Sequence, residues 1–174
     1  MPRHHRLLSM ALAAFLLVPS IARALGPSAD VYLGYTRMGD KNFNSTAGSQ
    51  SGIQLAGHLK LMPFVGAEVD YSHFGLSGAA SIPHSTVIMG GPRVTFGAGS
   101  AKLFLHGLAG WEHSGSGDGL IKAGALTFAM GGGADFKIKP HIFWRVTADY
   151  LGAPQSAPAG ATHTRFGTGV VLRF

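Results

Sequence analysis

Adjacent serine and histidine residues are the part of this sequence that could support nucleophilic catalysis. They occur three times, as Ser72-His73, His84-Ser85 and His113-Ser114. A serine nucleophile needs a histidine base within hydrogen-bond reach and a carboxylate that orients the histidine. Neighbouring side chains of an extended segment point to opposite faces, so direct pairing is not expected. We therefore predict no catalytic residues.

Histidines could also ligate a metal or form a pH-sensitive rim. Four of them fall near the expected ends of extended segments, at His73, His84, His113 and His163. Their expected faces differ, and no carboxylate stands at the short spacing that metal sites use. The chain also has no Cys. We predict neither a metal nor another cofactor, and expect His58 and His106 to form hydrogen bonds inside the fold.

Charged residues form the third group with chemical potential, and their spacing is regular. Pairs separated by an even number of positions are Glu68/Asp70, Lys102/Glu112, Asp135/Lys137, Arg145/Asp149 and Arg165/Arg173. Even spacing places two residues on the same face of a strand. The intervening positions are mainly apolar, and Arg37 is the only charged residue that we place on an apolar face. Each strand is thus expected to have one charged and one apolar face.

The elements that would position these residues are strands, because period-two alternation recurs throughout the chain. We predict eight, at 29–37, 52–62, 64–74, 86–97, 101–112, 124–138, 141–151 and 163–174. The connections alternate between tight turns and long polar loops. This pattern indicates an all-β, antiparallel, up-and-down transmembrane barrel with short periplasmic turns and longer extracellular loops.

The charged face is expected to line the lumen. It carries many small residues, such as Gly91, Gly131 and Gly167, which weaken strands but leave room inside a narrow barrel. A soluble, lipocalin-like barrel would place the charges in water instead and gives no reason for these glycines. Seven basic and six acidic residues are predicted to point inward, a near balance that favours a structural ion-pair network. Its predicted members are Glu68, Asp70, Arg93, Asp135, Arg145 and Asp149.

One contact within this network follows from counting positions from the short turns. Glu68 and Arg93 reach similar heights on neighbouring strands, so we expect their side chains to meet. Arg93 is also expected to neutralise Asp70, which lies one inward position higher, with Arg145 approaching the same layer.

The N-terminal segment is interpreted as a cleaved secretory signal peptide over residues 1–24, followed by a single barrel domain over 25–174. It has basic residues, the apolar run LLSMALAAFLLV and a small-x-small site at Ala22-Arg23-Ala24. Removing its three arginines lowers the formal charge of the chain from +6 to +3. The remaining charge gives no support for binding to nucleic acid, which requires clustered Lys and Arg.

The last strand carries a further signal. Phe166, Val170, Leu172 and Phe174 alternate along one face and end on an aromatic residue. This arrangement resembles the C-terminal assembly signal of bacterial outer-membrane barrels. Across residues 29–174 the chain resembles the small eight-stranded family typified by the transmembrane domain of outer-membrane protein A.

The resemblance implies a monomer in the outer membrane of a diderm bacterium. Its expected partners are outer-membrane lipids, periplasmic chaperones and the barrel assembly machinery. The implied function is a structural barrel that displays surface loops in adhesion or cell-surface protection. A narrow channel for small solutes is the alternative. A surface lipid-modifying enzyme is a third, although His163-Thr164-Arg165 lacks the His-x-Ser arrangement of the enzymes on this scaffold.

Overall fold

The computed structural model describes residues 29–40, 50–75, 84–97, 99–115, 122–153 and 161–174. The signal peptide predicted for residues 1–24 and the central parts of the four long loops lie outside these ranges. The described strands are β1 (Ala29–Asp40), β2 (Gln50–Lys60), β3 (Val65–Phe74), β4 (His84–Phe96), β5 (Ala101–Gly115), β6 (Lys122–Lys139), β7 (Ile142–Ala153) and β8 (Ala161–Arg173). No helix in these ranges is long and apolar enough to cross a membrane.

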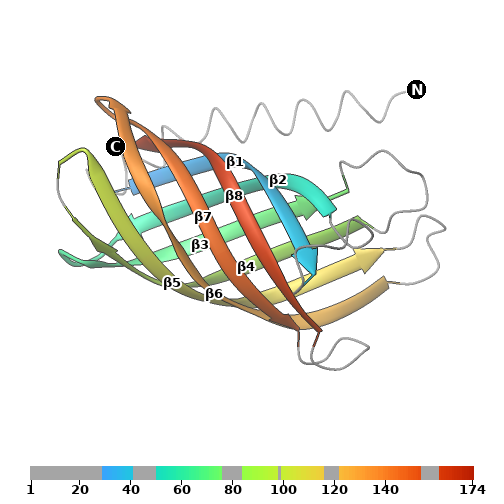
Figure 1. Cartoon of the computed structure of the whole chain (residues 1–174). Helices are drawn as coiled ribbons and strands as arrows, with labels where there is room; N and C mark the ends of the chain where they lie inside the picture. Colours follow the sequence, from blue (N-terminus) through green and yellow to red (C-terminus); the bar gives the residue numbers. More distant parts are fainter. Residues whose placement is uncertain (1–28, 41–49, 76–83, 98, 116–121, 154–160) are drawn as a thin grey trace, which may run out of the picture.

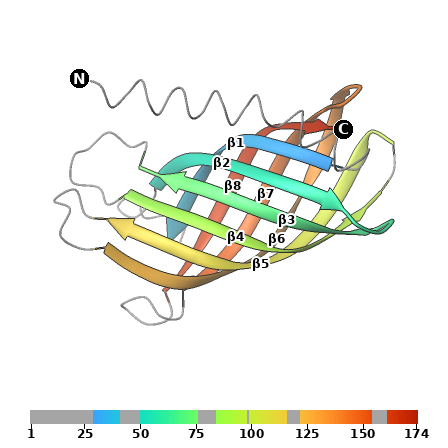
Figure 2. The same ribbon diagram turned by 180° about the vertical axis from the view of Figure 1, so that it is seen from behind.

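The eight strands form one closed barrel. Each strand pairs antiparallel with the next in the chain, and β8 closes the cylinder by pairing with β1. The strands are strongly tilted, and the three short turns and the C-terminus lie at the same end (Figure 1, and from behind in Figure 2). We call this the turn end and the opposite one the loop end. The predicted up-and-down barrel is confirmed.

Strand boundaries differ from the sequence prediction mainly at the loop end. β1 continues to Asp40 and β5 to Gly115, because ladder pairing with neighbours extends strands into Gly- and Ser-containing sequence. At the turn end, β2 stops at Lys60, two residues earlier than predicted. There the amides of Leu61 and Met62 both donate to the carbonyl of Val65, which closes the β2–β3 turn.

Glycines on the inner face make room for lumen side chains. A Cβ atom on Gly167 would lie 2.6 Å from Thr147 Oγ1 and 2.8 Å from Gln54 Oε1. One on Gly133 would lie 2.8 Å from Cζ of Phe104. The glycines therefore provide the space that larger side chains occupy in the lumen.

The outer face is apolar. Val69 and Leu105 are each 60% exposed and Met130 is 74% exposed, values that indicate contact with lipid in a membrane barrel. Exposed aromatic residues occur towards both ends, with Trp144 on β7 near the turn end and Trp111 on β5 near the loop end. This is the arrangement of the aromatic girdles of membrane barrels. The structure thus places the apolar faces outside, as predicted.

The charged lumen

Charged side chains fill the middle of the lumen and are shielded from solvent. Each of the six predicted network residues is at least 96% buried. Isolated charges at this depth would be strongly unfavourable, so their partners decide whether the barrel is stable.

Glu68 and Arg93 meet inside the barrel. Arg93 Nη1 donates to Glu68 Oε2 at 3.0 Å, and Arg93 Nη2 lies 3.5 Å from Asp135 Oδ2. β3 and β4 pair with Gly66 opposite Arg93 and Glu68 opposite Gly91. The two charged side chains are therefore diagonal neighbours on the inner face, within reach of a long guanidinium.

Arg145 and Arg93 differ from expectation in their second partners. Arg145 was expected near Asp70, but it lies directly opposite Asp135 in the β6–β7 ladder. Its Nε donates to Asp135 Oδ1 at 2.6 Å and its Nη2 to Oδ2 at 3.0 Å, a bidentate pair. Arg93 likewise reaches Asp135 instead of Asp70. Counting from the turns failed here because it ignores the stagger of tilted strands around the barrel.

Asp70 is instead bound by Arg165 from β8. Arg165 Nη1 donates to Asp70 Oδ1 at 2.8 Å and to Ser72 Oγ at 2.8 Å, while its Nε donates to Asp149 Oδ2 at 2.8 Å. Gln54 Nε2 also donates to Asp70. Because β3 and β8 are not neighbours in the sheet, this guanidinium spans the lumen.

His106 joins the two parts of the network. Its Nδ1 lies 3.0 Å from Glu68 Oε1 and its Nε2 lies 2.8 Å from Asp149 Oδ1. Ionised carboxylates only accept hydrogen bonds, so both ring nitrogens must donate when both carboxylates are ionised. The geometry therefore favours an imidazolium.

Arg173 extends the network to the turn end. Its Nε donates to Asp30 Oδ1 at 2.6 Å and its Nη2 to Asp135 Oδ2 at 2.9 Å. His58 Nδ1 lies 3.2 Å from Asp30 Oδ2.

The charges of this continuous network balance. The carboxylates are Asp30, Glu68, Asp70, Asp135 and Asp149, and the cations are Arg93, Arg145, Arg165, Arg173 and the doubly bonded His106. Five negative groups thus face five positive groups. We call these ten residues the lumen network.

Aromatic rings pack against the arginines of the lumen network, and these contacts were not predicted from the sequence. The guanidinium carbon of Arg93 lies 3.7 Å from the centroid of Phe104, and that of Arg145 lies 4.7 Å from the same centroid. Tyr32 also lies near Arg145, at 5.1 Å. Desolvated cation–π contacts of this kind are worth about 2 kcal/mol. Phe104 lies two residues from His106, so the even spacing could have identified it as an inward residue.

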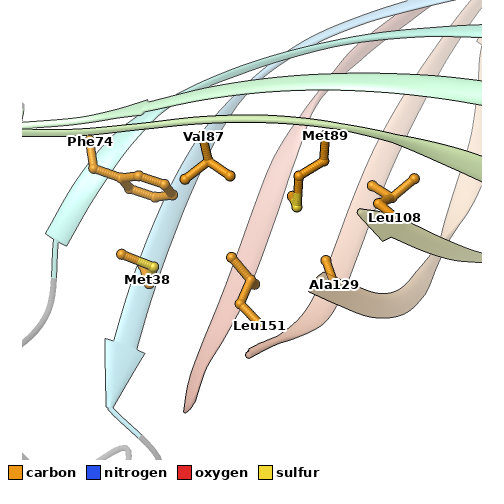
Figure 3. Packing of buried hydrophobic residues seen from close by; sticks show 7 residues of the cluster. All are labelled: Met38, Phe74, Val87, Met89, Leu108, Ala129 and Leu151. Atoms are coloured by element: carbon orange, nitrogen blue, oxygen red, sulfur yellow. The ribbon is translucent and has the colours of Figure 1, made fainter. Parts of the chain in front are cut away.

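Towards the loop end the lumen contains an apolar cluster beside polar residues such as Ser85 and Glu112. Seven buried side chains pack together there and toward the middle of the barrel (Figure 3): Met38, Phe74, Val87, Met89, Leu108, Ala129 and Leu151. They come from β1, β3, β4, β5, β6 and β7. We call this cluster the apolar plug. It was not anticipated, because the inner face had been defined by charges and small residues.

Two of the candidate serines, Ser72 and Ser85, donate to carboxylates. Ser72 donates to Asp70 Oδ1 at 2.9 Å, whereas the His73 ring contacts Thr86 Oγ1 at 2.9 Å. Ser85 donates to Glu112 Oε1 at 2.6 Å. In the described part of the chain, no group of three or more His, Cys, Asp or Glu residues is arranged to hold a metal ion.

The apolar side of β8 faces outward. Phe166, Val170 and Phe174 are 43%, 45% and 37% exposed, and Leu172 is partly exposed. The strand pairs with β1 from His163 to Arg173, and the amide of Phe174 donates to the carbonyl of Ala29 at 2.9 Å. The terminal residue is therefore part of the barrel wall.

Comparison with solved structures identifies the architecture. Neisserial surface protein A matches with a TM-score of 0.63 and 12% identity, covering 84% of this chain and 96% of that one. Ail, the attachment invasion locus protein of Yersinia pestis, matches at 0.54 and 15%, covering 84% and 97%. The N-terminal β-barrel domain of Pseudomonas aeruginosa OprF matches at 0.54 and 13%, covering 84% and 98%.

Sequence comparison adds nothing to this result. No protein-family model matches the chain, and no curated protein sequence matches it. The structural matches and the closed eight-stranded topology agree with each other and with the resemblance found in the sequence. The chain has the fold of the small eight-stranded outer-membrane β-barrels.

Proposed function

We propose that the protein is a monomeric outer-membrane protein whose barrel serves as a rigid support for loops displayed at the cell surface. In this proposal the turn end faces the periplasm and the loop end faces the exterior. The apolar outer face and the aromatic residues near both ends support residence in lipid. The four long connections all leave the same end of the barrel, which supports their display together.

The observation that carries the structural role is the filled lumen. Arg165 spans the barrel between β8 and β3, and the apolar plug occupies the space towards the loop end. Two layers of different chemistry therefore occupy the path that a solute would take. An eight-stranded barrel is just wide enough for its side chains to fill, so the same residues that stabilise it also oppose passage. A structural barrel is favoured over the alternative of a small-solute channel.

Adhesion is the surface role that we favour for the loops. One similar structure, Ail, is an attachment invasion locus protein, and it has the same fold at 15% identity. Binding residues are disproportionately found on loops held by a rigid scaffold. The lumen network and the plug provide that rigidity here.

The outward residues of β8 are proposed to act in biogenesis. Phe166, Val170, Leu172 and Phe174 form the outward, apolar face of β8, the strand that closes the barrel. Such a face is suited to recognition by periplasmic chaperones and the barrel assembly machinery before β8 pairs with β1.

Single-channel recording tests the structural role against the channel. Protein folded into planar bilayers is expected to give no stable conductance steps. The double variant Met89→Ser, Leu108→Ser is the matched comparison, because it opens the apolar plug without touching the lumen network. Stable ohmic steps from the unmodified protein would establish a channel.

Cell binding tests the loops. Replacing residues 41–49 or 116–121 with short Gly-Ser linkers is expected to reduce attachment of expressing cells to host-cell monolayers. Barrel levels are checked by heat-modifiable gel migration.

Mass spectrometry of lipid A from expressing and deletion strains tests the enzymatic alternative, and a modification that depends on the protein would contradict the structural role.

A further inference from the structure

A cavity opens at the turn end of the lumen. Its volume is about 180 Å³, and its walls come from the ends of β1, β2, β3, β4, β5 and β8 and from the β2–β3 and β4–β5 turns. The side chains that matter for its chemistry are Asp30, His58, Lys60, Phe64, Lys102 and Arg173. We call it the turn-end cavity.

The turn-end cavity carries more positive than negative charge. The lumen network is neutral without Lys60 and Lys102, and neither lysine takes part in its ion pairs. Lys60 lies two residues from the inward His58, and Lys102 lies two from the inward Phe104, so both belong to the inner face. Lys102 is repelled by the charges of Arg173 and Lys60 and attracted by those of Asp30 and Asp135, two carboxylates that the network already pairs with arginines. The lysines therefore add two positive charges that the network does not neutralise.

Asp30, the carboxylate in the cavity lining, already accepts hydrogen bonds from other groups. Asp30 accepts from Arg173 through both of its oxygens, and His58 lies against Oδ2 as well. One donor is left over on the same groups. Arg173 Nη1 is buried and has no hydrogen-bond partner among the described residues. An unpaired buried donor is unfavourable, and an acceptor that enters the cavity would give it a partner.

We propose that the turn-end cavity binds a phosphate group, held between Lys60 and Lys102 with Arg173 at its base. A phosphomonoester dianion matches the two unneutralised charges, and lysine binds phosphate well as a point charge. A volume of about 180 Å³ accommodates a phosphate and several waters. The group could belong to a soluble phosphate ester or to a phospholipid, whose chains would extend past the exposed Phe64 at the rim.

The test uses the full mature chain folded in zwitterionic micelles at constant ionic strength. Inorganic phosphate, glycerol 3-phosphate and dihexanoyl phosphatidic acid are titrated separately by calorimetry. Saturable binding is expected, with a rise in Tm that follows the ligand concentration. Binding of glycerol 3-phosphate identifies a soluble ester as the source. Binding of phosphatidic acid alone identifies a lipid headgroup.

The variant Lys60→Gln, Lys102→Gln is expected to weaken binding about tenfold or more, equivalent to about 1.4 kcal/mol. The matched control is Lys137→Gln, Lys139→Gln, which removes two exposed lysines from the same end outside the cavity lining. It should retain the affinity of the unmodified protein. An equal loss in the control would show a general charge effect and overturn the proposal. So would the absence of saturable binding for all three probes. Circular dichroism and gel migration verify that every variant is folded.

Discussion

Arg165 and Asp70 are joined across the lumen by a hydrogen bond of 2.8 Å between Nη1 and Oδ1, although 95 residues separate them in the chain. Both side chains are fully buried. β1 and β2 separate β8 from β3 in the closed barrel, so the contact crosses the lumen. The contact therefore connects β8, the last strand, directly to β3.

Replacing Arg165 with Met is expected to destabilise the barrel by about 3–5 kcal/mol, because Asp70 and Asp149 would lose their shared cation. Urea unfolding in lipid vesicles, followed by tryptophan fluorescence, measures the change. Lys137→Met is the control, because this exposed lysine lies outside the lumen network. Adding Asp70→Asn to the Arg165 variant should recover part of the loss. A stability equal to that of the control would contradict the role given to Arg165.

Even spacing made much of this fold predictable. Charges, glycines and apolar residues alternate with period two, and a strand has only two faces, so most of the inward set could be assigned without knowing the barrel. Lys137, which was predicted to point inward because it shares the parity of Asp135, is an exception: it is exposed, next to a shift of the β6–β7 register. The Glu68–Arg93 contact also lay within reach of sequence reasoning, because β3 and β4 are consecutive and their heights can be counted.

Contacts across the barrel could not be obtained this way. The pairing of Asp70 with Arg165 depends on closure and on the stagger of the strands, neither of which is local in the sequence. The apolar plug was missed for a different reason. Leu108 and Leu151 lie on the inner face of strands that also carry inward charged residues. Only their height in the barrel places them beside other apolar side chains, and height around a closed barrel cannot be read from one strand.

The outer face makes its own prediction. Val69→Arg or Leu105→Arg should destabilise the barrel by about 2–4 kcal/mol if the site lies near the midplane of the bilayer, because a charge would then face hydrocarbon. Refolding titrations in vesicles measure this change, and Val69→Leu and Leu105→Met serve as apolar controls. Unchanged stability for both arginine variants would indicate that this face meets water.

Deleting Phe174 should impair assembly in the cell. The residue ends the outward apolar edge of β8, and its amide bonds to Ala29 on the strand that closes the barrel. Less heat-modifiable protein is expected in the outer-membrane fraction and more in the periplasm. Phe174→Tyr keeps the aromatic ring and is expected to assemble normally. Equal outer-membrane yields for the deletion and the full chain would rule out an assembly role for this residue.

The Glu68–Arg93 pair can be isolated with a double-mutant cycle. Arg93→Met alone should cost about 3–5 kcal/mol, because Glu68 is 97% buried and would lose its guanidinium partner. Glu68→Gln alone should also destabilise, since it leaves Arg93 and His106 with one carboxylate fewer.

Combining the two changes removes both charges together, so the double variant should be more stable than the sum of the single losses predicts. We expect a coupling energy of about 1–3 kcal/mol, within the range for residues in direct contact. In the single variants, Glu68 keeps its contact with His106 and Arg93 keeps its contact with Asp135. We therefore expect the coupling energy to be smaller than the full cost of either single change. Pairing Arg93→Met with Lys137→Gln provides the control cycle, in which the losses should simply add. Strict additivity in the Glu68–Arg93 cycle would show that their hydrogen bond does not contribute to the stability of the barrel.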